Sequence, residues 1–331
     1  MLNLNVPGLT CAQLNRTTKM TMPIKTRFLT ILALLISGHT SALELTSKFY
    51  GEVNVAYDSV SPGDSDFQSW VSRIGVKGDV PLTENTSVIY QIEQEVDPLH
   101  GGLKASTLFS MRNTFFGFKT PAGKFFFGTH DTPMKRSQGK ADLFNDQAGD
   151  VKKLVSGEVR AKESFFYHSP DVRGFQTQLA YVPSDDLNDA STSLSLSYTG
   201  KTLYIAYAND QDMRKNDVSL SKNKVFDTQR LSAVYKLGDL QVSGILQQSE
   251  RKDVLNANKE HGYSLGASYK VDQYKLLTQY GRSDILKPDA LSWHLGVERK
   301  LGKTAKAYLY HWRYDQSDDS HTTSLGVEYK F

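Results

Sequence analysis

Apolar and aromatic side chains occur at every second position in many short segments of this chain. At the C-terminal end, Leu325, Val327, Tyr329 and Phe331 alternate with small or polar residues, and residues 263–269 repeat the arrangement. A period of two is typical of β-strands that present one apolar face, whereas the spacing of a helix hardly appears after residue 48. The sequence therefore predicts an all-β fold.

The connections between these segments alternate between short and long. Tight turns are indicated at 120–123, 171–174, 200–201, 238–239, 270–273 and 302–303. Longer polar runs lie between them, at 183–190, 211–226 and 251–259. A transmembrane antiparallel up-and-down β-barrel has short turns at one end and longer loops at the other. A soluble β-sandwich gives no reason for this sorting, so we expect a transmembrane barrel.

The predicted strands number about sixteen, an even number, as in single-chain bacterial barrels. Pattern boundaries are good to about two to four residues, so fourteen and eighteen strands remain alternatives. We assign residues 43–331 to the barrel. The strand centres lie near Val53, Gly75, Gln91, Phe116, Phe126, Phe166, Leu179, Leu196, Ile205, Ala233, Gly244, Leu265, Leu277, Leu295, Leu309 and Val327.

Residues 1–42 are predicted to be a cleaved signal peptide. Lys25 and Arg27 precede the apolar run 28–38, and a small-x-small pattern ends at Ala42. A positive flank, a short apolar core and a small-residue exit are the parts of a secretory signal. The apolar run is shorter than the roughly 20 residues that a membrane-spanning helix needs. Met20 and Met22 remain open as alternative starts, because the residues before Met20 fit no export pattern.

Cleavage after Ala42 changes the charge and removes the only cysteine. The leader holds four basic residues and no acid, so the formal charge falls from +3 to −1. The basic pI of the whole chain therefore does not indicate a nucleic-acid partner, and we expect none. Without Cys11, the remaining 289 residues have no thiol for a disulfide, a CxxC zinc site or a cysteine nucleophile. We expect no cofactor.

One connection departs from the alternating pattern. Residues 132–162 show little period-two alternation and are rich in Lys, Asp, Gln and Gly. Long segments without regular structure are uncommon and are usually functional or disordered. This segment follows the fifth predicted strand, and a barrel of this width needs something to narrow it. We therefore expect it to form a constriction.

Four stretches resemble the general porin family of Gram-negative bacteria. They are Ser72–Asp79, Arg112–Lys119 with Gly123–Thr129, Ser164–Pro170, and Gly326–Phe331. Their order and spacing carry the resemblance, because none of them is a catalytic signature. The resemblance implies a homotrimeric, sixteen-stranded barrel in the outer membrane whose third outer loop folds into the lumen. It also implies a water-filled channel for passive diffusion of small hydrophilic solutes and ions.

In such porins, basic side chains on the wall face acidic side chains on the loop at the narrowest point. The loop here lacks the Pro-Glu-Phe-Gly-Gly run of the enterobacterial pattern, and the run DLFNDQAGD stands in its place. The residues that match the wall positions or supply the loop acids are Arg73, Arg112, Lys162, Asp142, Asp146 and Asp150. Opposed charges of this kind bias which hydrated solutes enter a wide pore.

The alternation of residues places Arg73 more directly than Arg112. Arg73 shares its face with Lys77, whereas Arg112 has the parity of Phe116 and Phe118. That parity suits the lipid face, yet an arginine at the membrane midplane there costs about 2–4 kcal/mol. We therefore expect both arginines to face the lumen. The alternative is that each is a solvated lumen charge outside the constriction.

The remaining aromatic residues predict contacts with the membrane. Rings near strand ends form girdles at both membrane interfaces, so outer-membrane lipid and lipopolysaccharide are expected partners. Terminal Phe331 resembles the sorting signal read by the barrel-assembly machinery. The predicted girdle residues are Tyr57, Tyr181, Tyr198, Tyr207, Tyr235, Tyr269, Tyr329 and Phe331.

Three other functions compete with a general diffusion channel. A barrel hydrolase needs a Ser–His pair oriented by a third group. No nucleophile motif surrounds His168, His294 or His311, so we predict that the protein is not an enzyme. A barrel-scaffolded receptor or adhesin remains an alternative, although the loops are modest in length. A substrate-specific porin also remains one; it would show an aromatic track along the lumen, and the sequence shows no clear track.

Overall fold

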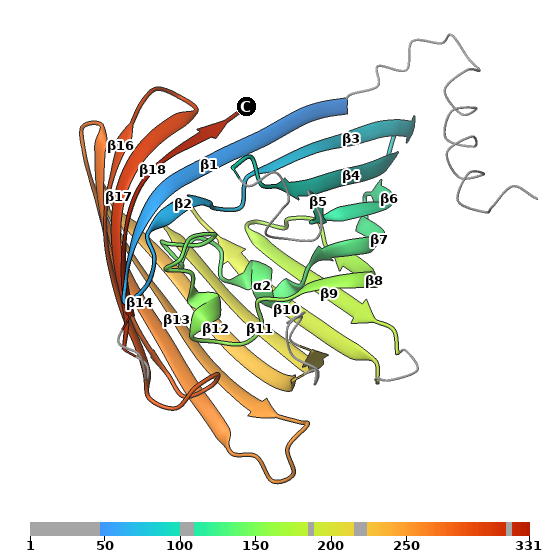
Figure 1. Ribbon diagram of the computed structural model, residues 1–331. Coiled ribbons are helices and arrows are strands. Elements are labelled where there is room, and N and C mark those ends of the chain that lie inside the picture. Colours follow the sequence, from blue (N-terminus) through green and yellow to red (C-terminus); the bar gives the residue numbers. More distant parts are fainter. Residues whose placement is uncertain (1–46, 100–108, 185–188, 215–223, 316–319) are drawn as a thin grey trace, which may run out of the picture. The chain divides into compact units, whose positions relative to one another are not determined.

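Antiparallel strands make up nearly all of the regular structure in the computed structural model (Figure 1). The structure describes residues 47–99, 109–184, 189–214, 224–315 and 320–331; the predicted signal peptide lies outside them. The strands are β1 (Ser47–Ser61), β2 (Asp66–Ser69), β3 (Arg73–Thr83), β4 (Thr86–Val96), β5 (Phe109–Met111), β6 (Thr114–Thr120), β7 (Gly123–Asp131), β8 (Arg160–His168), β9 (Phe175–Val182), β10 (Ser191–Thr199), β11 (Leu203–Arg214), β12 (Val225–Leu237), β13 (Leu240–Arg251), β14 (Lys259–Val271), β15 (Tyr274–Ser283), β16 (Ala290–Lys300), β17 (Ala305–Asp315) and β18 (Ser320–Lys330).

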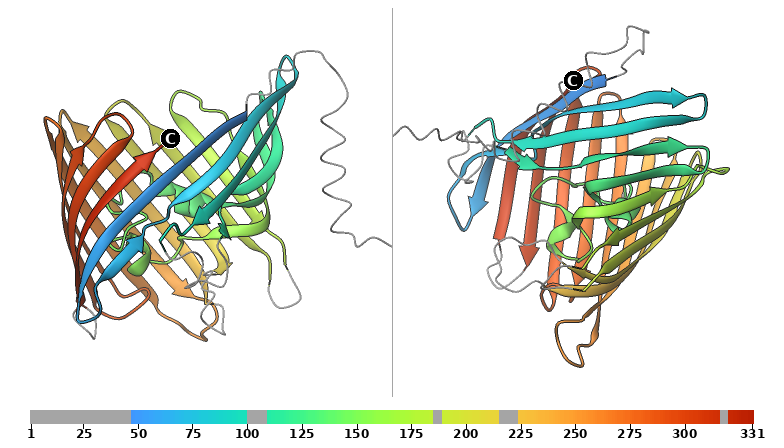
Figure 2. Two further views of the ribbon diagram at one scale, coloured as in Figure 1. Left: turned by 45° about the horizontal axis from the view of Figure 1, so that its top comes forward. Right: turned by 90° about the vertical axis from the view of Figure 1, so that its right-hand side faces the viewer.

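These strands form one closed barrel of sixteen. Each pairs with its neighbours in sequence, and β1 pairs with both β18 and β3, which closes the ring (Figure 2). Two barrel strands are interrupted: β2 and β3 pair with successive parts of β1, and β5 and β6 with successive parts of β4. Counting each interrupted strand once reduces eighteen segments to sixteen, so the predicted strand number is confirmed.

The two faces of the barrel differ in the way that the alternation predicts. On β17, Tyr308, Tyr310 and Trp312 are buried inside, whereas Leu309 between them is 49% exposed on the outer face. A barrel in lipid needs such an outward apolar surface. All the predicted girdle residues are exposed except Tyr198, which is half-buried.

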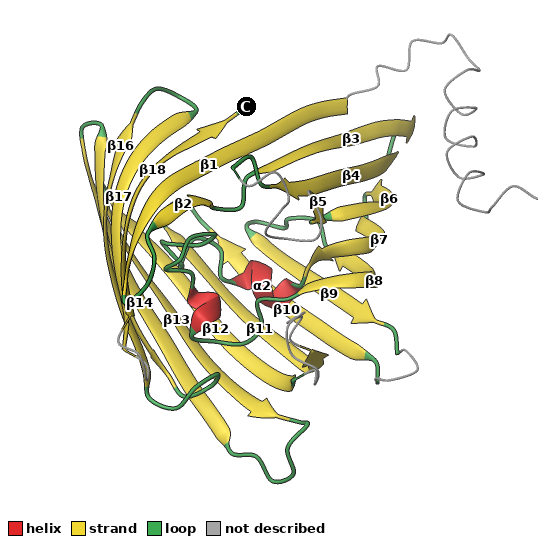
Figure 3. Ribbon diagram, viewed as in Figure 1, coloured by secondary structure: helices red, strands yellow, loops and turns green. Residues whose placement is uncertain are grey.

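The long connection between β7 and β8 contains the short helices of the described chain. It runs from residue 132 to residue 159 and is shorter than predicted, because β8 already begins at Arg160. It holds α2 (Pro133–Ser137) and the 3₁₀ helix η1 (Val151–Lys153), both of which lie inside the ring of strands (Figure 3). We call residues 132–159 the inward segment.

The ends of the inward segment's helices are stabilised locally. The Thr132 hydroxyl accepts a hydrogen bond from Lys135 N at 3.2 Å, and Pro133 follows it in the first turn, where a missing N–H costs nothing. The Asp150 carboxylate accepts from Lys152 N at 2.8 Å at the start of η1. No helix in the described ranges is long and apolar enough to span a membrane.

Candidate functional site

The inward segment packs its apolar side chains against the inner wall of β12–β17. Phe144 is 1% exposed, and its ring lies 5.2 Å from that of Tyr310 and 5.3 Å from that of His294. The Tyr314 hydroxyl donates to Ala148 O at 2.8 Å. A second cluster joins Val151, Leu154 and Val155 to buried residues of β12 and β13. We call β12–β17 the anchor wall.

Glycines in the anchor wall leave room for the segment. A Cβ on Gly281 would lie 2.5 Å from Leu154 Cδ1. A Cβ on Gly266 would lie 3.0 Å from Leu143 Cδ1, so that position is also filled by the segment. Because protein interiors are close-packed, a side chain at either glycine would displace the segment.

A buried arginine holds the last residues of the inward segment, just before β8 begins. Arg230 on β12 donates to Glu158 Oε1 at 2.6 Å, to Ser156 O at 2.8 Å and to Gln247 Oε1 at 2.7 Å. Its side chain is fully buried. Sequence reasoning missed this residue, although it shares the inward parity of Thr228 and Ser232 on β12.

On the opposite side of the lumen, the segment meets the predicted arginines. Arg73 Nη1 lies 3.1 Å from Asp146 Oδ2, and Arg112 Nη2 lies 4.0 Å from the same oxygen. Arg112 occupies the break between β5 and β6. This interruption lets it face inward while Phe116 and Phe118 face outward and are exposed. We call β1–β6 the arginine wall.

Three glutamates on the arginine wall were not predicted. Glu52 pairs with Arg73, while Glu93 and Glu95 accept from Arg112 at 2.9 and 3.1 Å. Two arginines therefore face four carboxylates, including Asp146, and these six groups have a formal charge of −2; Lys330 also lies 3.6 Å from Glu52. The alternation along β4 could have identified Glu93 and Glu95 as inward-facing residues.

Of the three candidate loop acids, Asp146 is the one that reaches the arginines in the described structure. Asp142 is buried and accepts from Phe144 N, Val151 N and Gln279 Nε2 at 3.0–3.1 Å. Asp150 accepts from Asp146 N and Lys152 N. Both acids thus hold the turn of the segment instead of facing the opposite wall.

Asp142 and Asp146 differ in the direction in which the protein shifts their pKa values. Burial, together with the neighbouring Asp150, raises the pKa of Asp142 to about 7. Burial acts in the same direction on Asp146, but the guanidinium groups of Arg112 and Arg73 outweigh it and hold its pKa below the usual value. Asp146 is therefore ionised wherever the protein is folded near neutral pH.

Lys162 lies outside this cluster. It is exposed on β8, at a bulge where the pairing with β7 shifts between Gly128 and His130. The basic residue that instead meets the base of the segment is Arg160, whose Nε lies 3.0 Å from Asp131 Oδ1. Lys135 lies 3.3 Å from the same carboxylate oxygen.

The aromatic row on β17 is covered. Tyr308, Tyr310, Trp312 and Tyr314 all face inward, yet each is at most 6% exposed. Phe144 and Ala148 of the inward segment pack on them. This row therefore anchors the segment and does not line an open path for solutes.

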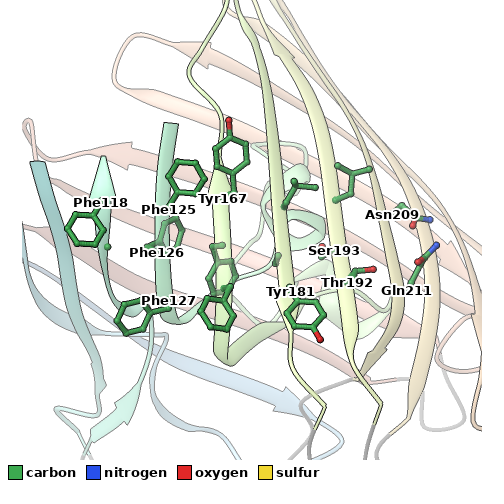
Figure 4. Close-up of a pocket in the computed structure, with 16 residues that line it drawn as sticks. Phe118, Phe125, Phe126, Phe127, Tyr167, Tyr181, Thr192, Ser193, Asn209 and Gln211 are labelled. Atoms are coloured by element: carbon green, nitrogen blue, oxygen red, sulfur yellow. The ribbon is translucent and has the colours of Figure 1, made fainter. Parts of the chain in front are cut away.

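An apolar hollow of about 650 Å³ lies on the outer surface of β6–β11 (Figure 4). Phe118, Phe125, Phe127 and Tyr181 line it and are all exposed. It belongs to the surface that faces lipid and not to the lumen. Within the described ranges, no group of three or more His, Cys, Asp or Glu side chains is placed to hold a metal ion.

Comparisons with known proteins agree with this architecture. A family model described as Gram-negative porin matches residues 29–330. The major outer membrane protein P.IB of Neisseria sicca is 28% identical over 159 residues, covering 44% of this chain and 43% of the relative. The chain thus spans less than half the length of that relative. Outer membrane porin protein 32 of Delftia acidovorans is 24% identical, covering 84% of this chain and 86% of that protein.

Solved porins share the fold at low sequence identity. OmpF of Salmonella typhi, in complex with daunomycin, has a TM-score of 0.71 at 16% identity, covering 87% of this chain and 98% of that one. The anion-selective porin from Comamonas acidovorans has a TM-score of 0.68 at 20% identity, covering 86% and 99%. With the family model matching nearly all of the barrel, the chain belongs to the Gram-negative porin family, a family of outer-membrane β-barrels and not of enzymes.

Proposed function

We propose that this protein is a general porin, which forms a water-filled channel for passive diffusion of small hydrophilic solutes and ions. The observation that carries the proposal is the inward segment, which is held between the anchor wall and the arginine wall of a closed barrel. Such a segment narrows a wide lumen without sealing it, so that solutes are sorted by size and charge.

The proposed throat lies where the segment approaches the arginine wall. Arg73, Arg112 and Asp146 line it, together with Glu52, Glu93 and Glu95. Asp142 and Asp150 support the throat by shaping the segment, and Lys162 lies outside it. A low-dielectric wall focuses the field of such a cluster into the aqueous path.

The excess of carboxylates at this throat favours cations there. The name of the Comamonas acidovorans relative describes an anion-selective porin. That property is not carried over to this chain, because four carboxylates face two arginines here. Screening acts over about 10 Å at 0.1 M salt, so the preference is expected at low salt and fades at 1 M.

The proposal includes export, assembly and trimer formation. Residues 1–42 direct export and are cleaved, and the barrel-assembly machinery recognises Phe331. Phe331 exchanges two backbone hydrogen bonds of 3.1 Å with Gly51 on β1, and its ring is exposed. It therefore lies at the seam that closes the barrel. A homotrimer is proposed because a solved relative, OmpT of Vibrio cholerae, is described in a trimer form.

The surrounding lipid and lipopolysaccharide contact the exposed apolar face.

A substrate-specific porin is the second candidate function. Buried aromatic residues on β17 argue against an aromatic path on that wall, since the inward segment covers them.

Planar-bilayer recording of the purified, folded protein tests the proposal. We expect ohmic single-channel steps in KCl that grow with salt concentration, and passage of small neutral sugars with a sharp size limit in swelling vesicles. Absence of conductance from heat-modifiable, folded protein would overturn the diffusion channel. Saturable passage of one sugar alone would favour the substrate-specific alternative.

A further inference from the structure

On five adjacent strands, an inward-facing residue beside the short-turn end of the barrel is a lysine. Lys270 continues the inward row of Ser264, Gly266 and Ser268 on β14. The other members are Lys275 on β15, Lys300 on β16, Lys306 on β17 and Lys330 on β18. Short turns lie on the periplasmic side of outer-membrane barrels. The lysines therefore lie at the periplasmic mouth of the lumen.

Two pairs of these lysines lie directly opposite each other across strands. Lys270 is the register partner of Lys275, and Lys300 is the register partner of Lys306. Like charges directly opposite each other on a sheet are destabilising. Such an arrangement needs compensation by acids or by a bound anion.

The acids nearby compensate only part of the row. Lys306 Nζ lies 2.8 Å from Glu298 and 3.3 Å from Glu328. Lys330 Nζ lies 2.7 Å from Glu328 and 3.6 Å from Glu52. Lys275 is the register partner of Glu298 on β16, but neither it nor Lys270 forms an ion pair within 4.0 Å with the described residues. Glu298 is shared with Lys306, so Lys270 and Lys275 together keep a net positive charge that an anion can neutralise.

The same residues line a cavity of about 280 Å³. Its lining holds six lysines, namely Lys270, Lys275, Lys300, Lys303, Lys306 and Lys330. Three acids, Asp272, Glu298 and Glu328, share the cavity, so its formal charge is +3. The cavity borders the arginine wall where Lys330 meets Glu52, but none of the six throat residues lines it, so it is a separate site.

We propose that this lysine cavity binds small multivalent anions, such as inorganic phosphate, pyrophosphate and phosphorylated solutes. Ammonium groups bind phosphate as point charges through charge-assisted hydrogen bonds. A multivalent anion matches the excess charge of the cavity and relieves the repulsion between Lys270 and Lys275, whereas a chloride ion neutralises a single charge. The cavity then raises the local concentration of such anions at the periplasmic mouth. This inference goes beyond diffusion, and the site exists whether or not the throat is charge-selective.

The direct test is calorimetric titration of the folded, purified protein with pyrophosphate at low ionic strength. The variant Lys270→Gln/Lys275→Gln removes two opposed cavity lysines that form no ion pair within 4.0 Å with the described residues. Lys119→Gln/Lys124→Gln is the matched control, because these lysines are also register partners at the same end of the barrel. There, Asp79 lies 2.9 Å from Lys119.

We expect the wild type to bind pyrophosphate, and the Lys270→Gln/Lys275→Gln variant to bind it about tenfold more weakly, since two charge-assisted donors are lost. The control should change by less than about twofold, because its lysines lie outside the cavity and Lys119 pairs directly with Asp79. Equal weakening in both variants, or no binding by the wild type, would overturn the site. Binding is measured without a membrane, so failure of the site is distinguishable from failure of the channel, which bilayer conductance of the same preparation reports. Heat-modifiable mobility on gels verifies that each variant is folded.

Discussion

The anchor wall and the arginine wall hold the inward segment by different means. The anchor wall contributes buried rings, glycines that make room for apolar side chains, and the fully buried Arg230. The arginine wall contributes ion pairs to Asp146, whose side chain is 23% exposed. Buried packing and satisfied buried hydrogen bonds stabilise strongly, whereas partly exposed ion pairs such as those of Asp146 contribute less.

The position of the inward segment and the ion selectivity of the pore therefore depend on different walls. The anchor wall fixes where the segment lies, and that contact is insensitive to salt. On the arginine wall, Arg112, Glu52 and Glu93 are buried. Arg73, Asp146 and Glu95 are partly exposed, and these three carry the charge that passing ions can reach. Changes to the anchor wall should therefore alter stability and pore size, and changes to the arginine wall should alter selectivity most clearly.

The largest effect is expected from Arg230→Met. It leaves Glu158 buried without its partner, and breaking a buried ion pair in this way costs about 3–5 kcal/mol. Urea unfolding of the folded barrel measures the loss. Arg282→Met is the control, because Arg282 and Asp289 form an exposed pair, and no measurable change is expected. Equal losses in the two variants would contradict a special role for the anchor wall.

A smaller effect is expected from Gly281→Val, which pushes into Leu154 of the segment. Overpacking of this kind costs about 1–3 kcal/mol. We expect faster protease cleavage within residues 132–159 and noisier single-channel currents. Gly244→Val is the matched control, because the nearest atom to its Cβ is 3.5 Å away. A segment that stays protected in Gly281→Val would show that it does not rest on this wall.

Acidity should affect the segment through Asp142. Its pKa is about 7 in the folded protein, against an ordinary value of 3.8. The folded state therefore holds an extra proton between these values, so stability falls as pH rises from about 4 to about 7 and is level above. Unfolding midpoints across this range measure the slope, and Asp142→Asn should flatten it. The same slope in the variant would assign the effect to another group.

The sequence predicted the barrel better than its interior. Strict alternation requires strands, and each predicted strand centre falls within a strand of the structure. Alternation gives the period but not the face: the apolar parity of β17 points into the lumen, because the inward segment covers it there. The interruption at Arg112 likewise resets the parity in a way that no propensity indicates.

For a related reason, the sequence pattern could not distinguish the roles of the acids in the segment. Asp142, Asp146 and Asp150 are spaced four residues apart and look equivalent in the sequence. Their roles differ because the turn at 142–151 buries two of them and directs Asp146 toward Arg73. Tertiary packing of the segment decides which acid faces the path, and a single sequence does not encode that locally.

The arginine wall should show the clearest change in selectivity among these variants. Reversal potential across a tenfold KCl gradient, with 0.1 M as the higher concentration, tests this most directly. Arg73→Ser/Arg112→Ser removes both guanidinium groups beside four carboxylates and should shift the potential strongly toward cations. Asp146→Asn should shift it more weakly toward anions, and Asp289→Asn, on an exposed loop, should leave it unchanged. The shifts should fade when the higher concentration is 1 M, where screening acts over about 3 Å. Potentials equal to the wild type in both throat variants at low salt would contradict the account.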